Sequence, residues 1–194
     1  MNMQSTQRQI ILASTSPRRY QLLKQLGLQF DTVASDFEEW LDATKTPEEM
    51  AGTLGLGKAL AVAEKYPEAI VIGSDTIVTV EGRQLGKAVD IDEARAMWRL
   101  ITSAANTIAT SVAVVCRAEN YEKVMCDNAF VTFKPYDEQS VEAYLATGDW
   151  HDKAAAYAIQ HPLVRTTIAK IGGNTETIVG LPTGLVQKML SDFT

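Results

Sequence analysis

Two long runs rich in β-branched and apolar residues stand close together at the centre of the chain. The first covers residues 107–117, the second covers residues 123–133, and residues 118–122 join them. Two strands with so short a connection are typical of an antiparallel β-hairpin. This hairpin constrains the fold most strongly, because the other predicted elements must be arranged on either side of it.

The chain's two cysteines lie in the predicted hairpin. Cys116 and Cys126 occupy mirrored positions about Tyr121, so a hairpin that turns there would place them opposite each other. We favour the interpretation that both are small buried apolar residues in a reducing compartment. Two cysteines and two separated histidines, His151 and His161, exclude a disulfide framework and a local zinc site.

Strands and helices alternate before the hairpin. Gln9–Ala13 is a short apolar run that predicts a strand. The next segment predicts a helix with Ser16 as its N-cap, Pro17 in its first position and Gly27 at its end. Gln29–Ala34 then predicts a second strand.

A long helix and a buried strand follow. Thr46-Pro47-Glu48-Glu49 has the spacing of a capping box, and the helix that it starts is predicted to reach about Lys65. Ala69–Val80 is dense in β-branched residues and predicts a buried strand, which Gly73-Ser74-Asp75-Thr76 interrupts with polar groups. Glu81-Gly82 predicts a turn at its end.

Several further helices are predicted from periodicity and composition. They cover Ile91–Ile101, Asp137–Thr147 and a last segment from Pro182 to about Ser191. Lys153–Gln160 is also predicted to be helical, because alanines follow one another in this segment.

Helices that alternate with strands around a central hairpin predict an α/β fold with a mixed, twisted sheet. The 194 residues suit one domain, and no linker interrupts them, so residues 1–194 are predicted to form one domain with two lobes around a cleft. Apolar residues make up 46% and charged residues 22%, which is typical of globular proteins and excludes a disordered chain.

Composition also limits the partners. The longest apolar stretches, such as Val112–Cys116, are far too short to cross a bilayer, and Met1–Gln9 is polar. We therefore expect a cytoplasmic protein without a membrane partner. The net charge of −6 argues against nucleic-acid binding, which needs a basic face, but leaves a small phosphorylated ligand open.

Hydroxyl groups and arginines gather where the first helix begins. Ser14 and Ser16 precede the helix, and Arg18 and Arg19 lie in its first turn. Helix N-termini attract anions, and arginine binds phosphate through two parallel hydrogen bonds. Taken alone, the segment is slightly better explained as an ordinary capped helix with solvated arginines.

Asp75 interrupts the predicted buried strand. A carboxylate in such a place must be hydrogen-bonded, paired or bound to a metal to offset its lost hydration. Asp36, Glu38 and Glu39 follow the second strand, and carboxylates from separate segments are what a hard divalent cation requires. The alternatives are a structural aspartate that accepts local N–H bonds and a solvated acidic loop.

Lysines supply the other candidates for phosphate binding. Lys58 in the long helix, Lys87 after Gly86, and Lys153 can each neutralise phosphate oxygens, although isolated lysines are normally solvated. The residues alone therefore support only a general prediction of a metal and a phosphate.

Seven short segments, which follow one another along almost the whole chain, are rich in glycine and in other small or charged residues. They are ILASTSPRR (residues 11–19), FEE (37–39), GKA (57–59), GSDTIV (73–78), GK (86–87), DKAAAYAIQ (152–160) and VGLP (179–182). In this order they resemble the motifs of the Maf family of nucleoside triphosphate pyrophosphatases.

The resemblance implies a fold, a reaction and a setting. The fold would be similar to that of the inosine triphosphate pyrophosphatases, with a cleft between two lobes. The reaction would cleave a nucleoside triphosphate between its α and β phosphates, with Mg²⁺ or Mn²⁺ as cofactor, and release a nucleoside monophosphate and pyrophosphate. The protein would be cytoplasmic and a homodimer.

Residue roles follow from the same resemblance. It implies that Asp75 is the general base, that Glu39 and Asp75 bind the metal, and that Lys58 and Lys87 clamp the phosphates. These roles suit the chemistry, because the negative charge of a triphosphate must be neutralised before water can attack it. The implied substrate-binding residues are Ser14, Ser16, Arg18, Arg19, Thr76, Lys153 and Gln160.

Three of these positions separate branches of the family. At these positions the chain resembles the branch that acts on dTTP and UTP, because it carries Arg18, Thr76 and Gln160. A pyrophosphatase of the 7-methyl-GTP type is the alternative, and it differs at all three positions.

The chain also departs from the family pattern. Thr53 stands where an arginine is usual, Ala88 where a proline is usual, and Ala155 and Ala158 where glycines are usual. A second hypothesis is therefore a nucleotide-binding regulator of cell division with weakened catalysis. The retained acidic and lysine residues favour the enzyme.

Overall fold

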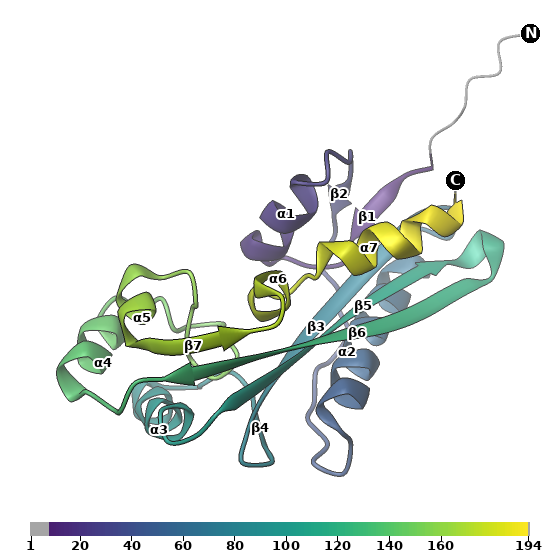
Figure 1. Cartoon of the computed structure of the whole chain (residues 1–194). Helices are drawn as coiled ribbons and strands as arrows, with labels where there is room; N and C mark the ends of the chain where they lie inside the picture. Colours follow the sequence, from purple (N-terminus) through teal and green to yellow (C-terminus); the bar gives the residue numbers. More distant parts are fainter. Residues whose placement is uncertain (1–7, 194) are drawn as a thin grey trace, which may run out of the picture.

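A seven-stranded mixed sheet forms the centre of the computed structural model, which describes residues 8–193 (Figure 1). Most of the segment Met1–Gln9 thus lies outside the described residues. The strand order is β2-β1-β3-β5-β6-β7, and β4 pairs with β3. β1 is parallel to β2 and β3, whereas the other described pairs are antiparallel. The predicted α/β fold with a mixed sheet is confirmed. The strands are β1 (Ile10–Leu12), β2 (Asp31–Thr32), β3 (Ile70–Val80), β4 (Arg83–Leu85), β5 (Asn106–Cys116), β6 (Tyr121–Phe133) and β7 (Ile168–Gly172).

Helices cover both faces of the sheet. In Figure 1, α2 lies behind β3, β5 and β6, while α6 and α7 lie in front of them. α3, α4 and α5 pack together at one end of the sheet. The α-helices are α1 (Pro17–Lys24), α2 (Pro47–Ala63), α3 (Ile91–Ile101), α4 (Glu138–Leu145), α5 (Pro162–Thr167), α6 (Thr175–Val179) and α7 (Thr183–Leu190).

The predicted hairpin is present as β5 and β6, but its turn lies earlier than expected. A short 3₁₀ turn and Asn120, with φ of 50°, close the hairpin, so Tyr121 already pairs with Cys116. Cys126 is opposite Ser111. The interpretation that the two cysteines face each other is therefore wrong, and both are free thiols. Cys116 is buried as expected, whereas Cys126 is half-buried.

The second strand is shorter than the sequence predicts. Of Gln29–Ala34, only Asp31 and Thr32 form a strand, and they pair with Ile11 and Leu12. β1 ends at Leu12, whose carbonyl still accepts the backbone N–H of Val33 at 3.0 Å, and the chain then turns toward the first helix. Residues 162–172 form α5 and β7, two elements that were not predicted from the sequence.

Alternating side chains of the sheet contribute to separate cores on its two faces. Ile11 and Val71 point to the face that α2 covers and pack with Val62 of that helix. Leu12 belongs to the larger core on the other face, which includes Trp98 of α3. The alternation follows from strand geometry, in which successive side chains point to opposite faces. In β3 it directs Asp75 toward α2, because Asp75 shares the face of Val71.

An open stretch along one edge of β3 prepares the site. On one edge, β3 pairs with β5 from Val71 to Val80. On the other edge it pairs with β1 over 70–72 and with β4 over 78–80. Within the described part of the chain, residues 73–77 thus have no strand partner on this edge. The polar segment of β3 therefore faces a gap between β1 and β4.

α2 crosses β3 and β5 at very short range. A Cβ atom on Gly73 would lie 2.2 Å from the carbonyl oxygen of Gly55. A Cβ atom on Gly55 would lie 2.3 Å from Ser111 Oγ. Glycine at both positions lets the helix backbone approach the sheet, and it places Lys58 of α2 beside Asp75. Packing, together with the capping box at Thr46, sustains the helix despite its glycines.

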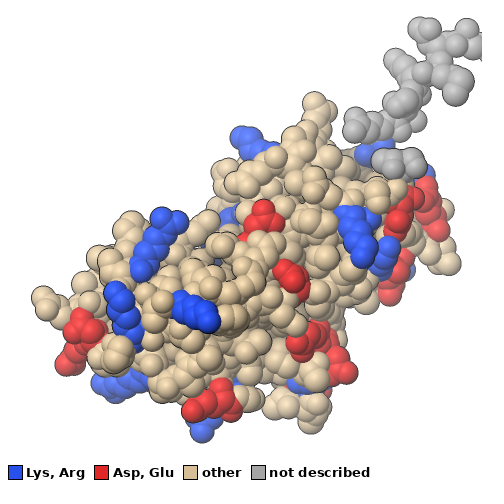
Figure 2. Space-filling view, viewed as in Figure 1, with Lys and Arg blue, Asp and Glu red and all other residues tan. Residues whose placement is uncertain are grey.

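Two observations bear on membrane and nucleic-acid partners. No helix within residues 8–193 is long and apolar enough to cross a membrane. On the face drawn in Figure 2, Lys and Arg side chains alternate with Asp and Glu side chains. Such a mixture differs from the continuous basic face that nucleic-acid binding needs.

Two alanine substitutions in α2 test the close crossing. At Gly52 a Cβ atom meets only Val124 Cγ1, at 3.5 Å, so we expect Gly52→Ala to raise the free energy of unfolding by about 1 kcal/mol. Gly55→Ala displaces Ser111 and should lower it by about 1–3 kcal/mol. Urea unfolding followed by circular dichroism measures both changes. Stabilisation by both substitutions would contradict the crossing described here.

Candidate active site

The gap beside β3 opens into a cavity of about 800 Å³. Its walls come from the turn after β1, the loop between β2 and α2, the end of β4 and the loop before α5. The residues to which the family resemblance assigns catalytic, metal-binding or substrate-binding roles all line this one cavity. They are Ser14, Ser16, Arg18, Arg19, Glu39, Lys58, Asp75, Thr76, Lys87, Lys153 and Gln160.

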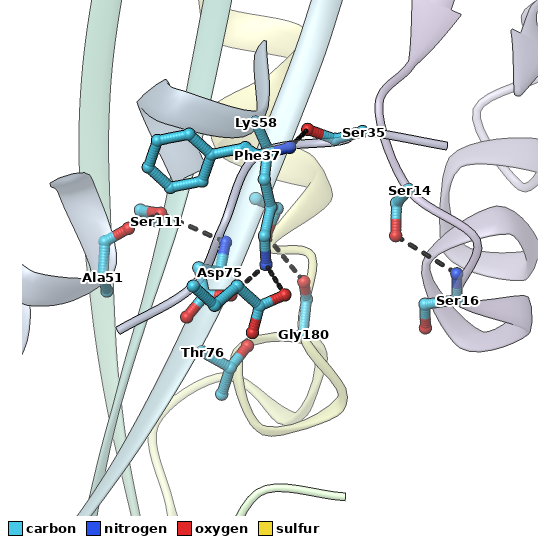
Figure 3. A network of polar contacts seen from close by, with 12 residues as sticks. Ser14, Ser16, Ser35, Phe37, Ala51, Lys58, Asp75, Thr76, Ser111 and Gly180 are labelled. Carbon is cyan, nitrogen blue, oxygen red and sulfur yellow. Dashed lines mark hydrogen bonds and ion pairs between the residues drawn. The ribbon is translucent and has the colours of Figure 1, made fainter. Parts of the chain in front are cut away.

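Lys58 lies at the centre of a network of ion pairs. Its Nζ is 2.5 Å from Asp75 Oδ1 and 2.9 Å from Glu39 Oε1 (Figure 3). The other oxygen of Glu39 is 3.6 Å from Lys87 Nζ. Lys58 and Asp75 each expose only 9% of the side chain, whereas Glu39 exposes 42% and Lys87 exposes 53%. The network thus runs from the interior to the mouth of the cavity.

The pKa of Glu39 reflects its place in this network. Burial alone would raise the pKa, but the hydrogen bond from Lys58 and the charges of Lys58, Lys87 and Arg19 lower it overall. Glu39 is therefore a carboxylate at neutral pH. Asp36 and Glu38, which the sequence offered with it, do not line the cavity, and Asp36 pairs instead with Lys65.

Ser111 fixes the backbone of Asp75. The N–H of Asp75 donates to Ser111 Oγ at 3.3 Å, and the Ser111 hydroxyl donates to the carbonyl of Ala51 at 2.6 Å (Figure 3). One side chain of β5 thus links β3 to α2 directly beside the ion pair. No local sequence pattern predicts this role of Ser111, because the role depends on the register of β3 with β5.

Gly180 organises the opposite face of β3. Its carbonyl accepts hydrogen bonds from Ser74 Oγ at 2.8 Å and from Arg19 Nε at 2.9 Å. Arg19 also contacts Thr76 Oγ1, and the hydroxyl groups of Thr76 and Thr110 are hydrogen-bonded at 2.9 Å. Gly180 has φ of +118°, a conformation that favours glycine. The segment 179–182, quoted from the sequence without a role, therefore holds Arg19 in place.

Three basic residues of the cavity have no carboxylate partner among residues 8–193: Arg18, Arg19 and Lys153. Burial lowers the pKa of Arg18, and the neighbouring charge of Arg19 lowers it further. Burial likewise lowers the pKa of Lys153, and the charge of Arg18 adds to this effect. Burial also lowers the pKa of Arg19. Nε of Arg18 is buried and has no hydrogen-bond partner within the described part of the chain. An anion placed among these groups would relieve all of these costs, so they form a candidate phosphate site.

Tyrosines that sequence reasoning did not select border the same wall. The hydroxyl of Tyr144 accepts the backbone N–H of Ala158 at 3.0 Å, and burial raises the pKa of Tyr144 to about 12. Tyr157 lines the cavity, and its buried hydroxyl has no partner in the described chain. Burial raises its pKa as well. Its only sequence signal is its place in the segment 152–160.

The predicted helix at Lys153–Gln160 is wrong. Ala154 forms an antiparallel bridge with Lys87, and the N–H of Ala155 donates to the carbonyl of Gly86 at 2.9 Å. Ala155 and Ala156 adopt left-handed φ values of 55° and 54° and are fully buried. These tertiary contacts outweigh the helix propensity of alanine and tie Lys153 to the loop that carries Lys87.

The left-handed backbone makes a test against a helix possible. Ala155→Gly relieves a left-handed conformation that costs alanine about 1–2 kcal/mol. This gain offsets two losses: the buried methyl group, worth about 0.8 kcal/mol, and the greater freedom of glycine in the unfolded chain. We expect its free energy of unfolding to stay close to that of the wild type. Ala158→Gly, outside the left-handed residues, should lower it by about 0.4–1 kcal/mol. Denaturant unfolding measures both, and equal losses would indicate a helix.

Comparisons with known proteins cover nearly the whole chain. The family model "Maf-like protein" matches residues 9–193. A protein from Pelotomaculum thermopropionicum is 40% identical over 96% of this chain and 97% of its own length. One from Symbiobacterium thermophilum is 40% identical over 95% and 94%, and one from Shouchella clausii is 39% identical over 94% of each chain. All three bear the name dTTP/UTP pyrophosphatase. Because the match spans the whole sheet and its cavity, the chain belongs to the Maf-like protein family.

Proposed function

We propose that this protein hydrolyses dTTP, UTP and modified pyrimidine nucleoside triphosphates to the monophosphate and pyrophosphate. The observation that carries the proposal is the cavity itself, in which a buried Asp75–Lys58 pair lies opposite unpaired basic side chains. Relatives of about 40% identity over nearly the full chain, named dTTP/UTP pyrophosphatase, support the same reaction.

Asp75 is the general base in this proposal. Its carboxylate accepts a proton from a water molecule, whose oxygen attacks the α-phosphorus. The bond from this phosphorus to the bridging oxygen breaks, and the electron pair leaves with pyrophosphate. Lys58 holds one carboxylate oxygen of Asp75 at 2.5 Å, which fixes the direction of the base. A positioned base of this kind typically accelerates a reaction by about 10²–10⁴-fold.

Charge neutralisation is the second requirement of the reaction. Negative charge grows on the leaving pyrophosphate, and Lys58 and Lys87 stand on the same side of the cavity as the base. Arg18, Arg19 and Lys153, which form no ion pair among residues 8–193, line the same cavity and add further positive charge. Preformed charges of this kind stabilise the transition state because they need no reorganisation during the reaction.

A divalent cation fits the carboxylates of this site. Asp75 and Glu39 both direct an oxygen at one cation, the Lys58 ammonium. Among residues 8–193 no group of three or more acidic, histidine or cysteine side chains gathers around a common point. Mg²⁺ commonly binds through one or two carboxylates together with substrate phosphates. We propose that Asp75 and Glu39 hold Mg²⁺ or Mn²⁺, which when bound neutralises phosphate oxygens.

The base would be selected on the wall formed by Arg18, Thr76 and Gln160, all of which line the cavity. These are the three positions that favour the pyrimidine branch over the 7-methyl-GTP type. The intact ion-pair network also favours an enzyme over a regulator that only binds nucleotide. A homodimer and a cytoplasmic location rest on the family resemblance and belong to the same proposal.

Asp75→Asn tests the assigned base. The amide keeps the shape of the side chain but cannot accept the proton, so we expect kcat for UTP to fall by about 10²–10⁴-fold. Asp36→Asn is the matched control, because Asp36 pairs with Lys65 outside the cavity. Pyrophosphate release is followed at increasing Mg²⁺ and in EDTA, where the wild type should also lose activity. Wild-type turnover by Asp75→Asn at saturating Mg²⁺ would refute the mechanism.

Thr76→Val tests base selection. Loss of one polar contact is worth about 1 kcal/mol, so we expect the ratio of UTP to GTP hydrolysis to fall several-fold. Gln160→Ala should act in the same direction. Thr79→Val is the control on the same strand, since Thr79 does not line the cavity and its hydroxyl has no partner among the described residues. An unchanged ratio of kcat/KM values in both cavity variants would remove these residues from the base pocket.

A further inference from the structure

A large aromatic side chain stands at the mouth of the charged cavity. Trp40 exposes 48% of its surface, and Leu41 beside it exposes 46%, yet both line the cavity. The chain's other two tryptophans, Trp98 and Trp150, are buried in the core. Trp40 directly follows Glu39, whose carboxylate binds Lys58 and Lys87. None of the roles assigned above uses Trp40 or Leu41.

Phe37 provides a fixed support for Trp40. The Phe37 ring packs so closely on α2 that a Cβ atom on Gly57 would lie 2.2 Å from it. The backbone N–H of Phe37 donates to Ser35 Oγ at 3.1 Å, and Figure 3 shows the ring beside the Lys58 side chain. The rings of Phe37 and Trp40 have centroids 5.4 Å apart with an angle of 46° between their planes. Trp40 therefore rests on an anchored ring next to Lys58.

Leu41 packs near Gly86, and both residues line the cavity. A Cβ atom on Gly86 would lie 3.5 Å from Leu41 Cδ1, an ordinary van der Waals contact. Gly86 precedes Lys87, which pairs with Glu39. Trp40 and Leu41 thus border the part of the cavity that holds Lys58 and Lys87.

The backbone of residues 38–41 has few ties of its own. Within the described chain, no hydrogen bond involves the backbone N–H or C=O groups of these four residues. The Glu39 carboxylate, through its two lysine contacts, and the packing of Trp40 and Leu41 hold the segment. A ligand that competes for those lysines therefore acts directly on the position of Trp40.

We propose that Trp40, together with Leu41, folds over the phosphate end of the bound nucleotide and shields the Lys58–Asp75–Glu39 charges from water. The proposal rests on the function proposed above and adds a positioning residue to it. Charges that face each other away from water interact more strongly than hydrated ones, so such a cover increases the stabilisation that the lysines give to the leaving pyrophosphate. Trp40 thereby acts on turnover through the lysines and not through contact with the base.

Tryptophan fluorescence tests the cover directly, because Trp40 is the exposed tryptophan. Inorganic tripolyphosphate with Mg²⁺ is the probe of the phosphate end, and uridine is the probe of the base end. We expect tripolyphosphate to shift the emission of the wild type to shorter wavelength and to reduce its quenching by acrylamide. The response should be absent in Trp40→Phe and absent with uridine. Calorimetry in parallel measures whether each probe binds.

Kinetics separate the cover from a merely structural role. Trp40→Ala should lower kcat for UTP about tenfold with little change in KM, and Trp40→Phe should restore most of the loss. Val89→Ala, at a position 86% exposed and outside the cavity, is the control and should keep wild-type kinetics.

Two results would overturn the proposal: a fluorescence response to uridine without one to tripolyphosphate, or wild-type kcat in Trp40→Ala. Absence of UTP hydrolysis by the wild type would instead refute the proposed function. The two failures are thus distinguishable, because the tripolyphosphate experiment does not depend on hydrolysis.

Discussion

The buried ion pair between Lys58 and Asp75 is the interaction on which the arrangement of the site depends. Burying either charge alone would cost several kcal/mol, so each group requires the other. The pair also fixes how deeply α2 lies on the sheet, because Lys58 comes from the helix and Asp75 from β3. That depth is reached only with glycine at the crossing, where Gly55 and Gly73 let the two backbones meet. Gly55, which weakens the isolated helix, thus allows the close crossing that builds the site.

The open edge of β3 divides the cavity into two chemically different walls. On the α2 side, the positive charge of Lys58 is balanced by Asp75 and Glu39. Where α1 begins and in the loop before α5, Arg18 and Lys153 line the cavity without an ion pair to any carboxylate among residues 8–193. A triphosphate suits both walls, since it brings negative charge to the second and competes for the lysines of the first. This division explains how a chain with a net charge of −6 can attract a polyanion.

The parts of this structure that could be predicted are those with local causes. The caps at Ser16 and Thr46 bond to backbone groups three residues away, so spacing alone reveals them. Asp75 was also recognisable, because a carboxylate within a β-branched run needs a partner wherever the strand lies. The left-handed backbone at Ala155 could not be predicted, since its cause is a hydrogen bond to Gly86, far away in sequence.

In the proposed reaction, water activated at Asp75 attacks the α-phosphorus while pyrophosphate leaves toward the lysines. Hydrolysis of UTP by the wild-type protein in water enriched in ¹⁸O, with both products analysed by mass spectrometry, tests this reaction. We expect one ¹⁸O atom in uridine monophosphate and none in pyrophosphate. Label in pyrophosphate, or formation of uridine diphosphate with labelled inorganic phosphate, would contradict it.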